Sequence, residues 1–328
     1  MAAIETVGLE REFKGGLKAV GGVDISIAPG EVYGFLGPNG AGKTTTVRML
    51  VTLLRPTGGE ARVAGHDVAR EPDAVRRRIG VALQDAALDL LMTGRELMEL
   101  QAKLHGFAPR DVRPRADALI DRVGLVEAQD RRVGTYSGGM RRRLDLAMAL
   151  IHEPEVLFLD EPTTGLDPVS RRTLWEEVSR LKDEGTTVFL TTQYLEEADQ
   201  LADRVGIINA GLLVAEGTPA ELKAEVGIPH LEVTFADGSE TGRAREVLTQ
   251  FGELRPPQPG SDVSVGLASG ATGVAPVVRA LDEAGVIVGS LELVEPTLDD
   301  VFVEKTGRHL EGAGDDQDPD AAAGPEPA

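Results

Sequence analysis

The chain has 328 residues, a hydrophobic content of 41% and a net charge of −20, so it is long enough for one large core or two smaller ones. Its acidic balance argues against non-specific binding of nucleic acid through a basic surface, and the absence of cysteine excludes disulfides and zinc sites of the cysteine type and suits a reducing cytoplasm. The first residues, MAAIETVGLEREF, lack the apolar core of a secretory signal, and no apolar run approaches the roughly 18 residues that cross a bilayer, so we expect any membrane span to belong to another chain.

The first two thirds of the chain alternate between β-type and helical patterns. Short β-like runs fill residues 4–35, and the last of them, EVYGFLG, leads directly into a glycine-rich loop. Apolar strands then alternate with amphipathic helices, an order that predicts a mostly parallel sheet covered on both faces, with Trp175 in the core. The predicted helices are 44–54, 140–151, 169–184 and 194–204, with further helical spacing between 88 and 133, and the predicted strands are 156–161, 186–192 and a hairpin at 205–217.

The composition changes near Thr218 and Pro219. The following segment predicts a short helix, the strands HLEVTF and DVSVGL and the helices AREVLTQFG and GVAPVVRALDEAG, which together make a small α+β unit. We therefore expect a first domain over 1–218, with an inserted helical subdomain at about 85–150, and an accessory domain over 219–310. Residues 311–328 hold six acidic and no basic side chains among Pro, Gly and Ala, which indicates a disordered, solvating tail.

The glycine-rich loop Gly37–Thr44, GPNGAGKT, matches the phosphate-loop pattern G-x-x-x-x-G-K-[ST]. Glycines allow the backbone to approach an anion closely, Lys43 neutralises the β- and γ-phosphates, the Thr44 hydroxyl binds Mg²⁺, and the following helix contributes its N-terminal dipole. A strand before the loop and a helix after it supply the context that the motif requires. We expect ATP to contact Gly37, Pro38, Asn39, Gly40, Ala41, Gly42, Lys43, Thr44 and Thr45.

Two acidic residues follow the apolar run VLFL and end its predicted strand. Asp160 is suited to hold Mg²⁺ through water, and Glu161 to orient and deprotonate an attacking water. The alternative is that both acids only cap the turn before Pro162. The phosphate loop elsewhere in the chain favours the catalytic interpretation.

A second candidate anion site lies at YSGGM, where Ser137 suits a helix N-cap and Gly138 and Gly139 leave the N–H groups of the helix start accessible. One ATP does not need two such sites within one chain. The sequence therefore predicts a head-to-tail dimer in which each ATP lies between the phosphate loop of one chain and the Ser-Gly-Gly turn of the other. We expect the three arginines 141–143 to form a solvated helix face.

These motifs, in this order and spacing, resemble those of ABC transporter ATPase subunits over about residues 4–218. The resemblance implies a P-loop, RecA-like parallel sheet with an N-terminal antiparallel subdomain, the helical insertion and the small α+β domain. It also implies that Gln84, after the run IGVAL, touches Mg²⁺ and senses a membrane partner, and that Asp167 lies at the dimer interface. Phe13 fits the aromatic residue that stacks on adenine, although an isolated phenylalanine is more often part of a core.

One position departs from the usual pattern of that family. Most members have a histidine after the strand corresponding to VFLTT, and this chain has Gln193 in the run TTQYLEEADQLADR, which resembles the daunorubicin-resistance type of exporter ATPase. A neutral amide donates a hydrogen bond to a γ-phosphate oxygen but carries neither a proton nor a positive charge. Glu161 is therefore the better candidate for the catalytic base, with Lys43 and Gln193 holding the γ-phosphate.

The segment EPTLDDVFVEKTGR, residues 295–308, resembles the terminal motif of the same exporter ATPases. Its pattern predicts Thr297 as the N-cap of a short amphipathic helix with Leu298, Val301 and Phe302 on one face. Such a helix could dock on its own domain or on the partner subunit.

The resemblance implies an ATP-hydrolysing subunit that uses ATP and Mg²⁺ and works with a second copy of itself and a separate integral membrane permease. It places the protein in the cytoplasm, on the inner face of the membrane, and favours export of a drug or another hydrophobic compound, with no nucleic-acid partner. The alternatives are a soluble ABC ATPase that acts on ribosomes or DNA, and an ABC exporter of a lipid or polysaccharide. The first is disfavoured by the acidic charge and by the single phosphate loop.

Overall fold

The computed structural model describes residues 1–84, 88–235, 240–257 and 260–308. They form two compact units, Met1–Pro219 and Ala220–Gly307, which we call the N-terminal and the C-terminal unit. None of the helices in these ranges combines the length and the apolar composition that crossing a bilayer requires.

The N-terminal unit is built on a six-stranded sheet with the order β10-β9-β3-β8-β7-β6. Its strands are parallel, except that β10 pairs antiparallel with β9 and forms the hairpin expected from the sequence. The carboxyl ends of the parallel strands therefore meet at one edge, where ligands of such sheets bind. The bounds are β3 (Val32–Leu36), β6 (Ile79–Ala82), β7 (Val156–Asp160), β8 (Thr187–Thr192), β9 (Arg204–Asn209) and β10 (Leu212–Gly217).

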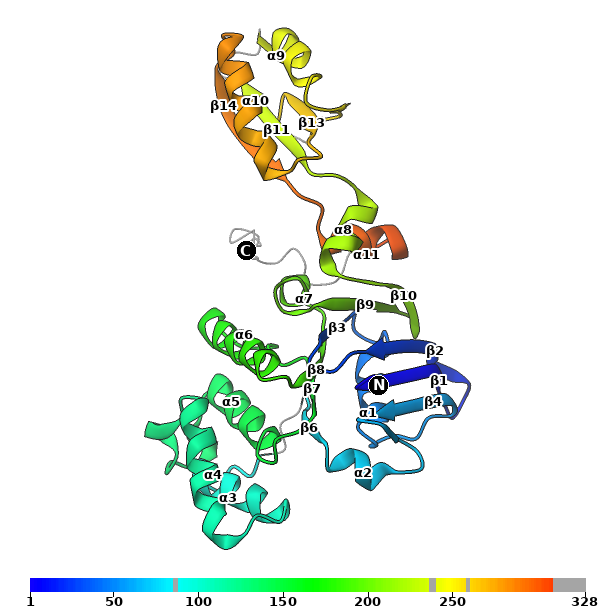
Figure 1. The fold of residues 1–328 in the computed structure, drawn as a ribbon, viewed down its shortest axis with the longest axis vertical. Helices are drawn as coiled ribbons and strands as arrows, with labels where there is room; N and C mark the ends of the chain where they lie inside the picture. The colour runs from blue at the N-terminus through cyan, green and yellow to red at the C-terminus, as the bar shows by residue number, and fades with distance from the viewer. Residues whose placement is uncertain (85–87, 236–239, 258–259, 309–328) are drawn as a thin grey trace, which may run out of the picture. The chain divides into compact units, whose positions relative to one another are not determined.

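Both faces of this sheet are covered. Along β7 the side chains alternate, with Leu157 and Leu159 in one apolar cluster and Val156 and Phe158 in another. The first cluster contains the helices α5 (Gly138–Ala149) and α6 (Pro168–Asp183), and the second contains α1 (Lys43–Leu50) and the N-terminal antiparallel sheet, as Figure 1 shows. This two-layered burial explains why the strands consist of continuous apolar runs.

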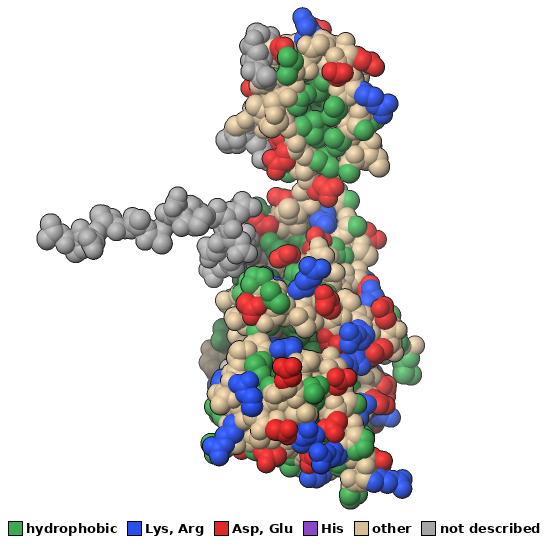
Figure 2. Space-filling view, turned by 90° about the vertical axis from the view of Figure 1, so that its left-hand side faces the viewer, with side chains coloured by type: hydrophobic (Ala, Val, Ile, Leu, Met, Phe, Trp, Pro, Cys, Tyr) green, Lys and Arg blue, Asp and Glu red, His purple; other side chains and the backbone are tan. Residues whose placement is uncertain are grey.

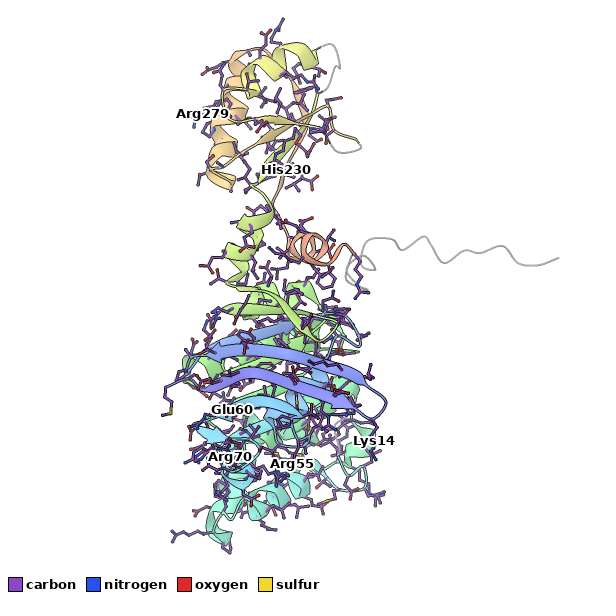
Figure 3. All side chains as sticks on the ribbon, turned by 90° about the vertical axis from the view of Figure 1, so that its right-hand side faces the viewer. Lys14, Arg55, Glu60, Arg70, His230 and Arg279 are labelled. Carbon is purple, nitrogen blue, oxygen red and sulfur yellow. The ribbon has the colours of Figure 1, made fainter. Side chains whose placement is uncertain are left out.

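The antiparallel sheet has the order β2-β1-β4-β5. Its strands are β1 (Ile4–Phe13), β2 (Leu17–Ile27), β4 (Gly58–Val63) and β5 (His66–Asp67), and the short helix α2 (Pro72–Arg76) follows them. Figure 3 shows this sheet, with Lys14 at the turn between β1 and β2 and Glu60 on β4. Acidic and basic side chains are interspersed over the face of the N-terminal unit seen in Figure 2.

The inserted helical part comprises α3 (Gly94–Leu104), α4 (Pro109–Arg122), the short 3₁₀ turns Val126–Ala128 and Val133–Thr135, and α5. Thr93 begins α3 with a capping box, in which its hydroxyl accepts from the Glu96 N–H while the Glu96 carboxylate accepts from the Thr93 N–H. After the sheet resumes, α7 (Leu195–Leu201) lies between β8 and β9 in the sequence. Trp175 on α6 is half-buried against the apolar cluster that contains α5.

The C-terminal unit has its own apolar core, with two helices packed on an antiparallel sheet of order β12-β13-β11-β14. The order of its elements is β-α-β-β-α-β, which is the ferredoxin-like arrangement. The predicted α+β fold is therefore confirmed, although β12 and β14 were not among the predicted strands. The elements are β11 (His230–Phe235), α9 (Thr241–Leu248), β12 (Leu254–Arg255), β13 (Val263–Gly266), α10 (Ala271–Glu283) and β14 (Val288–Val294).

Two further helices flank this sheet in the sequence, α8 (Pro219–Val226) and α11 (Leu298–Thr306). Thr297 caps α11 as predicted, and it forms a capping box with Asp300. The predicted apolar face, Leu298, Val301 and Phe302, is fully buried. Lys305 of α11 donates to Glu225 of α8 at 2.9 Å, so α11 docks within its own chain. The acidic segment 311–328 lies outside the described residues.

Candidate active site

The phosphate loop Gly37–Thr44 joins the end of β3 to the start of α1. Gly42 has a φ of 110°, and a Cβ atom on it would lie 2.5 Å from the carbonyl oxygen of Ala19. At Gly37 a Cβ atom would lie 2.3 Å from the carbonyl oxygen of Ile208. Only glycine fits such close backbone approaches. The loop is therefore held between β2 and β9 and leads directly into the N-terminus of α1, where helix geometry favours an anion.

Lys43 is the first residue of α1, and its side chain is almost fully buried. Its ammonium group donates to the carbonyl oxygens of Gly37 at 2.6 Å and Pro38 at 3.2 Å, and it lies 3.2 Å from Glu161 Oε1. Burial lowers the pKa of Lys43, and the Glu161 carboxylate opposes that shift. The loop thus holds a cation at its centre beside a catalytic candidate.

Asp160 is the last residue of β7 and is 1% exposed. Its Oδ1 accepts from the Thr44 hydroxyl at 3.3 Å and from the Thr191 hydroxyl at 2.5 Å. Its Oδ2 is buried and has no hydrogen-bond partner among the described residues. Because a buried carboxylate oxygen without a partner is costly, this oxygen is suited to contact an electropositive group.

Glu161 follows Asp160 with a φ of +47°, an uncommon conformation for a residue that has a side chain. Its N–H donates to the carbonyl oxygen and the hydroxyl of Thr191, both at 3.1 Å. Its carboxylate lies between Lys43 and the amide of Gln84, which donates to Oε2 at 3.4 Å. Backbone strain of this kind is concentrated at functional sites, and the conformation aims Glu161 into the cleft.

These groups form one cleft of about 230 Å³ at the carboxyl edge of the parallel sheet. The structure therefore brings seven of the nine predicted loop residues together with Gln84 and Glu161, whereas Gly37 and Ala41 are not among the lining residues. Asp160 contacts the cleft through its hydrogen bond with Thr44. The alternative that the two acids only cap a turn does not account for this arrangement. The residues lining the cleft are Ala19, Pro38, Asn39, Gly40, Gly42, Lys43, Thr44, Thr45, Gln84 and Glu161.

A second group of predicted residues lies elsewhere on the same unit. Ser137 caps α5 by accepting from the Met140 N–H at 3.2 Å, and Ser137 and Gly138 are exposed. A Cβ atom on Gly139 would lie 2.5 Å from the Ser170 hydroxyl, and that hydroxyl donates to Asp167 at 2.6 Å. The Ser-Gly-Gly turn (Ser137–Gly139) and Asp167 are thus neighbours, but neither is among the residues that line the phosphate cleft.

Gln193 and Phe13 are not among the residues that line the cleft. Gln193 is half-buried and follows Thr192, whose carbonyl oxygen accepts from the Gly37 N–H at 3.3 Å. Phe13 is 37% exposed at the end of β1, and the Arg11 guanidinium lies 4.8 Å from its ring centroid. Phe13 is therefore not a core residue, and its partly exposed ring has the Arg11 guanidinium over one face.

The prediction that the arginines 141–143 form a solvated helix face is wrong for the middle residue. Arg142 is 9% exposed, and its guanidinium donates to three backbone carbonyl oxygens around the site. The helical period turns this side chain toward β7 while its two neighbours point elsewhere. A run of three arginines contains no signal that distinguishes the buried member from the others.

Sequence reasoning also missed Thr191 and Ala19. Thr191 holds both Asp160 and Glu161, and Ala19 lines the cleft through the close contact of its backbone with Gly42. The position of Thr191 at the end of the buried strand TTVFLTT is a usable signal, because neighbouring parallel strands end at the same edge. Ala19 contributes through its backbone, so the identity of its side chain gives no sequence signal for this role.

Family comparisons agree with this geometry. The model of the ABC transporter family matches residues 20–164. The model of the ATP-binding protein DrrA1-3-like C-terminal domain matches residues 217–306. Each of the two units is thus matched by one family model.

The chain is also similar over almost its whole length to characterised proteins. It is 50% identical to the daunorubicin resistance ATP-binding protein DrrA3 of Streptomyces coeruleorubidus, over 93% of this chain and 96% of that protein. It is 48% identical to the daunorubicin/doxorubicin resistance ATP-binding protein DrrA of Streptomyces peucetius, over 93% and 92%. It is 43% identical to the doxorubicin resistance ATP-binding protein DrrA of Mycobacterium tuberculosis, over 89% and 90%.

Solved structures give the same result for the fold. The structure of cbiO1 from Clostridium perfringens, part of the ABC transporter complex cbiONQ, aligns with 68% of this chain and 91% of its own at 27% identity and a TM-score of 0.63. The dimeric structure of MJ0796, a bacterial ABC transporter cassette, aligns with 66% of this chain and 98% of its own at 25% identity and a TM-score of 0.61. The predicted resemblance and fold class are confirmed, and the chain belongs to the ATP-hydrolysing subunits of ABC transporters, in their DrrA-like branch.

Proposed function

We propose that this chain energises the export of a daunorubicin-like drug, as one of two identical ATPase subunits beneath a separate permease. ATP hydrolysis, the first part of this proposal, is supported mainly by the cleft in which Lys43, Gln84 and Glu161 lie together. The drug-export half is supported by the similarity of both units to proteins named for daunorubicin or doxorubicin resistance.

The residues around Asp160 fit a magnesium ion. The Thr44 hydroxyl and the Asp160 carboxylate are neighbouring oxygen donors, and Oδ2 of Asp160 is buried without a partner in the described chain. Oxygen ligands with one or two carboxylates are what Mg²⁺ prefers. We assign Thr44, Asp160 and Gln84 to this ion, which would neutralise charge on the phosphate oxygens when bound.

The hydrolytic roles follow from where the side chains lie. Lys43 and the loop N–H groups bind the phosphates, and Gln193 donates a hydrogen bond to the γ-phosphate. Glu161 accepts the proton of the attacking water, and Gln84 orients its carboxylate. Since phosphoryl transfer depends on positioning and charge neutralisation, the fixed backbone of Glu161 and the buried charge of Lys43 are the main contributions of this chain.

The Ser-Gly-Gly turn, which is exposed at Ser137 and Gly138 but buried at Gly139, supports a composite site. It is an accessible helix N-terminus that lies beside Asp167 and outside the phosphate cleft of its own chain. A head-to-tail dimer places the turn of one chain over the phosphate loop of the other, so that each ATP is held by both. The related cassette solved as a dimer supports this arrangement.

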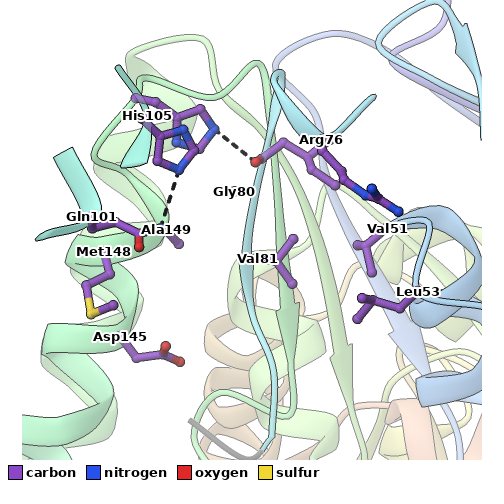
Figure 4. A pocket seen from close by; sticks show the side chains of 12 residues that line it. Val51, Leu53, Arg76, Gly80, Val81, Gln101, His105, Asp145, Met148 and Ala149 are labelled. Carbon is purple, nitrogen blue, oxygen red and sulfur yellow. Dashed lines mark hydrogen bonds between the residues drawn. The ribbon is translucent and has the colours of Figure 1, made fainter. Parts of the chain in front are cut away.

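A separate cleft of about 290 Å³ is our candidate for permease docking (Figure 4). It lies between the helical part and β6, the strand that leads to Gln84. Leu53 on its wall and the nearby Leu104 on α3 are more than half exposed, which is typical of a surface that a partner covers. The lining residues are Val51, Leu53, Arg76, Ile79, Gly80, Val81, Gln101, His105, Asp145, Met148, Ala149 and His152, and we call them the docking cleft.

This assembly would place the chain on the cytoplasmic face of the membrane through the permease. A second candidate cargo has support, because the chain is also 36% identical over 94% of its length to a Nod factor export ATP-binding protein of Cupriavidus metallidurans. Export of a cargo other than a drug, such as the lipid or polysaccharide expected as an alternative from the sequence, therefore stays as the second candidate.

Co-purification with the permease and measurement of drug-stimulated ATPase activity tests the proposal. We expect daunorubicin to stimulate ATP hydrolysis by the complex and to accumulate in inverted vesicles only when ATP is present. The Glu161→Gln complex serves as the matched control that binds ATP without turning it over. A complex that hydrolyses ATP but is neither stimulated by daunorubicin nor transports it would contradict drug export. Export of the second candidate cargo would then remain as the proposed function.

A further inference from the structure

Arg142 makes contacts that link three parts of the N-terminal unit. Its Nε donates to the carbonyl oxygen of Pro162 at 2.9 Å, Nη2 to that of Asp160 at 2.9 Å, and Nη1 to that of Leu83 at 2.5 Å. Asp160 and Pro162 are the two neighbours of Glu161, and Leu83 precedes Gln84. The Arg142 guanidinium therefore holds the backbone on both sides of Glu161. It also holds the backbone just before Gln84, whose amide donates to the Glu161 carboxylate.

This support matters because the backbone of Glu161 is strained. A residue with a side chain is unfavourable at a φ of +47° and keeps this conformation only where its surroundings hold it. Thr191 holds the N–H of Glu161 from β8, and Arg142 holds the two adjacent carbonyl groups from α5. A planar group with five donors is suited to bind several carbonyls at fixed positions, which a lysine ammonium cannot reproduce.

Asp145, one helical turn further along α5, extends this contact to the docking cleft. Its Oδ2 lies 3.5 Å from Nη1 of Arg142, and the residue also lines the docking cleft. Figure 4 shows the Asp145 carboxylate projecting from its helix toward β6. The carboxylate is 13% exposed, so it contacts both the arginine and whatever occupies the cleft.

We propose that Arg142 is a positioning residue for ATP hydrolysis, which keeps Glu161 and Gln84 in their working geometry and is itself positioned by Asp145. The inference rests on the proposed role of Glu161 as the base. Arg142 is assigned to the hydrolytic step because it contacts the backbone around Glu161 and Gln84. It is not assigned to ATP binding, because the phosphate loop is held by β2 and β9.

The test compares Arg142→Lys with Arg143→Lys in the full chain. Arg143 is the matched control, because it lies next on the same helix and also donates to backbone carbonyls, those of Val123 and Gly124. We expect Arg142→Lys to bind ATP with nearly unchanged Kd and KM while kcat falls about 10- to 100-fold, the scale of loss from small misplacement of a catalytic group. Arg143→Lys should keep its kcat within about twofold, since the carbonyls that Arg143 contacts follow α4 and do not belong to the backbone around Glu161 or Gln84.

A double-mutant cycle with Asp145→Asn tests the link to Asp145. We expect Asp145→Asn to lower kcat with unchanged KM, and the double variant to lose less than the product of the two single losses, because the two residues act as one unit. If Arg142→Lys does not fold, Arg142→Gln, which keeps an amide donor, is compared in the same way.

Three results would overturn parts of the account separately. Equal kcat values for the two lysine variants, or parallel loss of ATP binding and kcat in Arg142→Lys, would show that Arg142 is only structural. Multiplicative losses in the cycle would remove Asp145 from the pathway. Near-normal turnover in Glu161→Gln would instead remove the base on which the inference rests.

Discussion

At the scale of single residues, the site combines a buried cation with a strained acid. Lys43 has three oxygen partners within 3.2 Å, two carbonyls and the Glu161 carboxylate. The two carbonyl oxygens accept hydrogen bonds from the Lys43 ammonium group. Lys43 therefore keeps these two partners when the charge of Glu161 is removed. Substitution of the acid should therefore impair chemistry more than it impairs the phosphate loop.

Gln193 tests how the γ-phosphate is held. Gln193→His should keep most of the activity, because both side chains donate a hydrogen bond. Gln193→Ala should lose about 10²- to 10³-fold in kcat, the typical effect of removing one donor to developing negative charge. Steady-state kcat measured beside ATP affinity separates these outcomes. Equal rates for all three proteins would show that the position takes no part in the reaction.

Asp145 gives a pH-dependent stability. Burial raises the pKa of Asp145 from 3.8 to about 6, and the nearby Arg142 opposes the shift. Because the folded pKa lies above the unfolded one, the group binds more protons when folded, and its contribution to stability is lost as the pH rises through about 6. Between pH 5.5 and pH 7.5 the natural protein should thus lose about 1 kcal/mol of unfolding free energy relative to Asp145→Asn.

Urea unfolding of the two proteins at both pH values measures this difference, and the comparison cancels groups that they share. A difference that stays constant with pH would show that the carboxylate is ionised equally in the folded and unfolded states.

At the scale of elements, α5 serves three places at once. Ser137 caps its exposed start, Arg142 in its second turn reaches the backbone around Glu161, and Asp145 faces the docking cleft. The helix therefore connects the turn that we propose for dimer contact, the cleft that holds Glu161 and the cleft that we propose for permease docking. A small shift of α5 would therefore change the geometry at all three of these places.

Helix α10 of the C-terminal unit has a buried and an exposed apolar residue whose substitutions can be compared. Leu281 is fully buried in the core of that unit, and Val278 is 42% exposed. Leu281→Ala should cost about 2–5 kcal/mol, as for other buried leucines, whereas Val278→Ala should change stability by about 0.5 kcal/mol or less. Thermal unfolding with and without ATP checks this, and ATP binding by the N-terminal unit should persist in both variants.

Equal destabilisation by the two substitutions would contradict the packing of α10 described here.

Sequence patterns predicted the elements that are buried on two sides and missed those at edges. The strands β7 and β8 are continuous apolar runs, so their place in the parallel sheet was predictable. Strand β14 lies at the edge of the C-terminal sheet with several exposed positions, and β12 has only two residues, so neither has a full apolar pattern. Strand β5 is also an edge strand and has only two residues, whereas β4 lies inside its sheet but begins with two glycines and has only two buried positions, so it too lacks a clear apolar pattern.

The site was predictable where a motif fixes both residue types and spacing. The loop Gly37–Thr44, with Asp160 and Glu161 after a buried strand, needed no structure to be found. The role of Arg142 was not predictable, because it depends on contacts between segments far apart in the sequence. For Thr191 the end of a buried strand was a signal, but its particular partners were not readable from the sequence. The partner of Asp160 on β8, for instance, is 31 residues away.

At the scale of the whole molecule, the chain offers two incomplete halves of one site. The phosphate cleft lacks the Ser-Gly-Gly turn, and the turn lies exposed beside Asp167. In the dimer that we propose, two copies related head to tail would complete both halves, and the pair would close on two ATP molecules. Opening and closing of that pair would be transmitted through the docking cleft.

The most direct test of this account is the ATP-dependent association of Glu161→Gln, followed by sedimentation and by ATPase assay. We predict that Glu161→Gln hydrolyses ATP very slowly and sediments as a dimer with ATP and as a monomer without it. Adding Ser137→Arg to the same chain, which blocks the turn but leaves the phosphate loop intact, should keep ATP binding and abolish the dimer. Near-normal hydrolysis by Glu161→Gln, or an ATP-induced dimer that survives Ser137→Arg, would contradict the shared site.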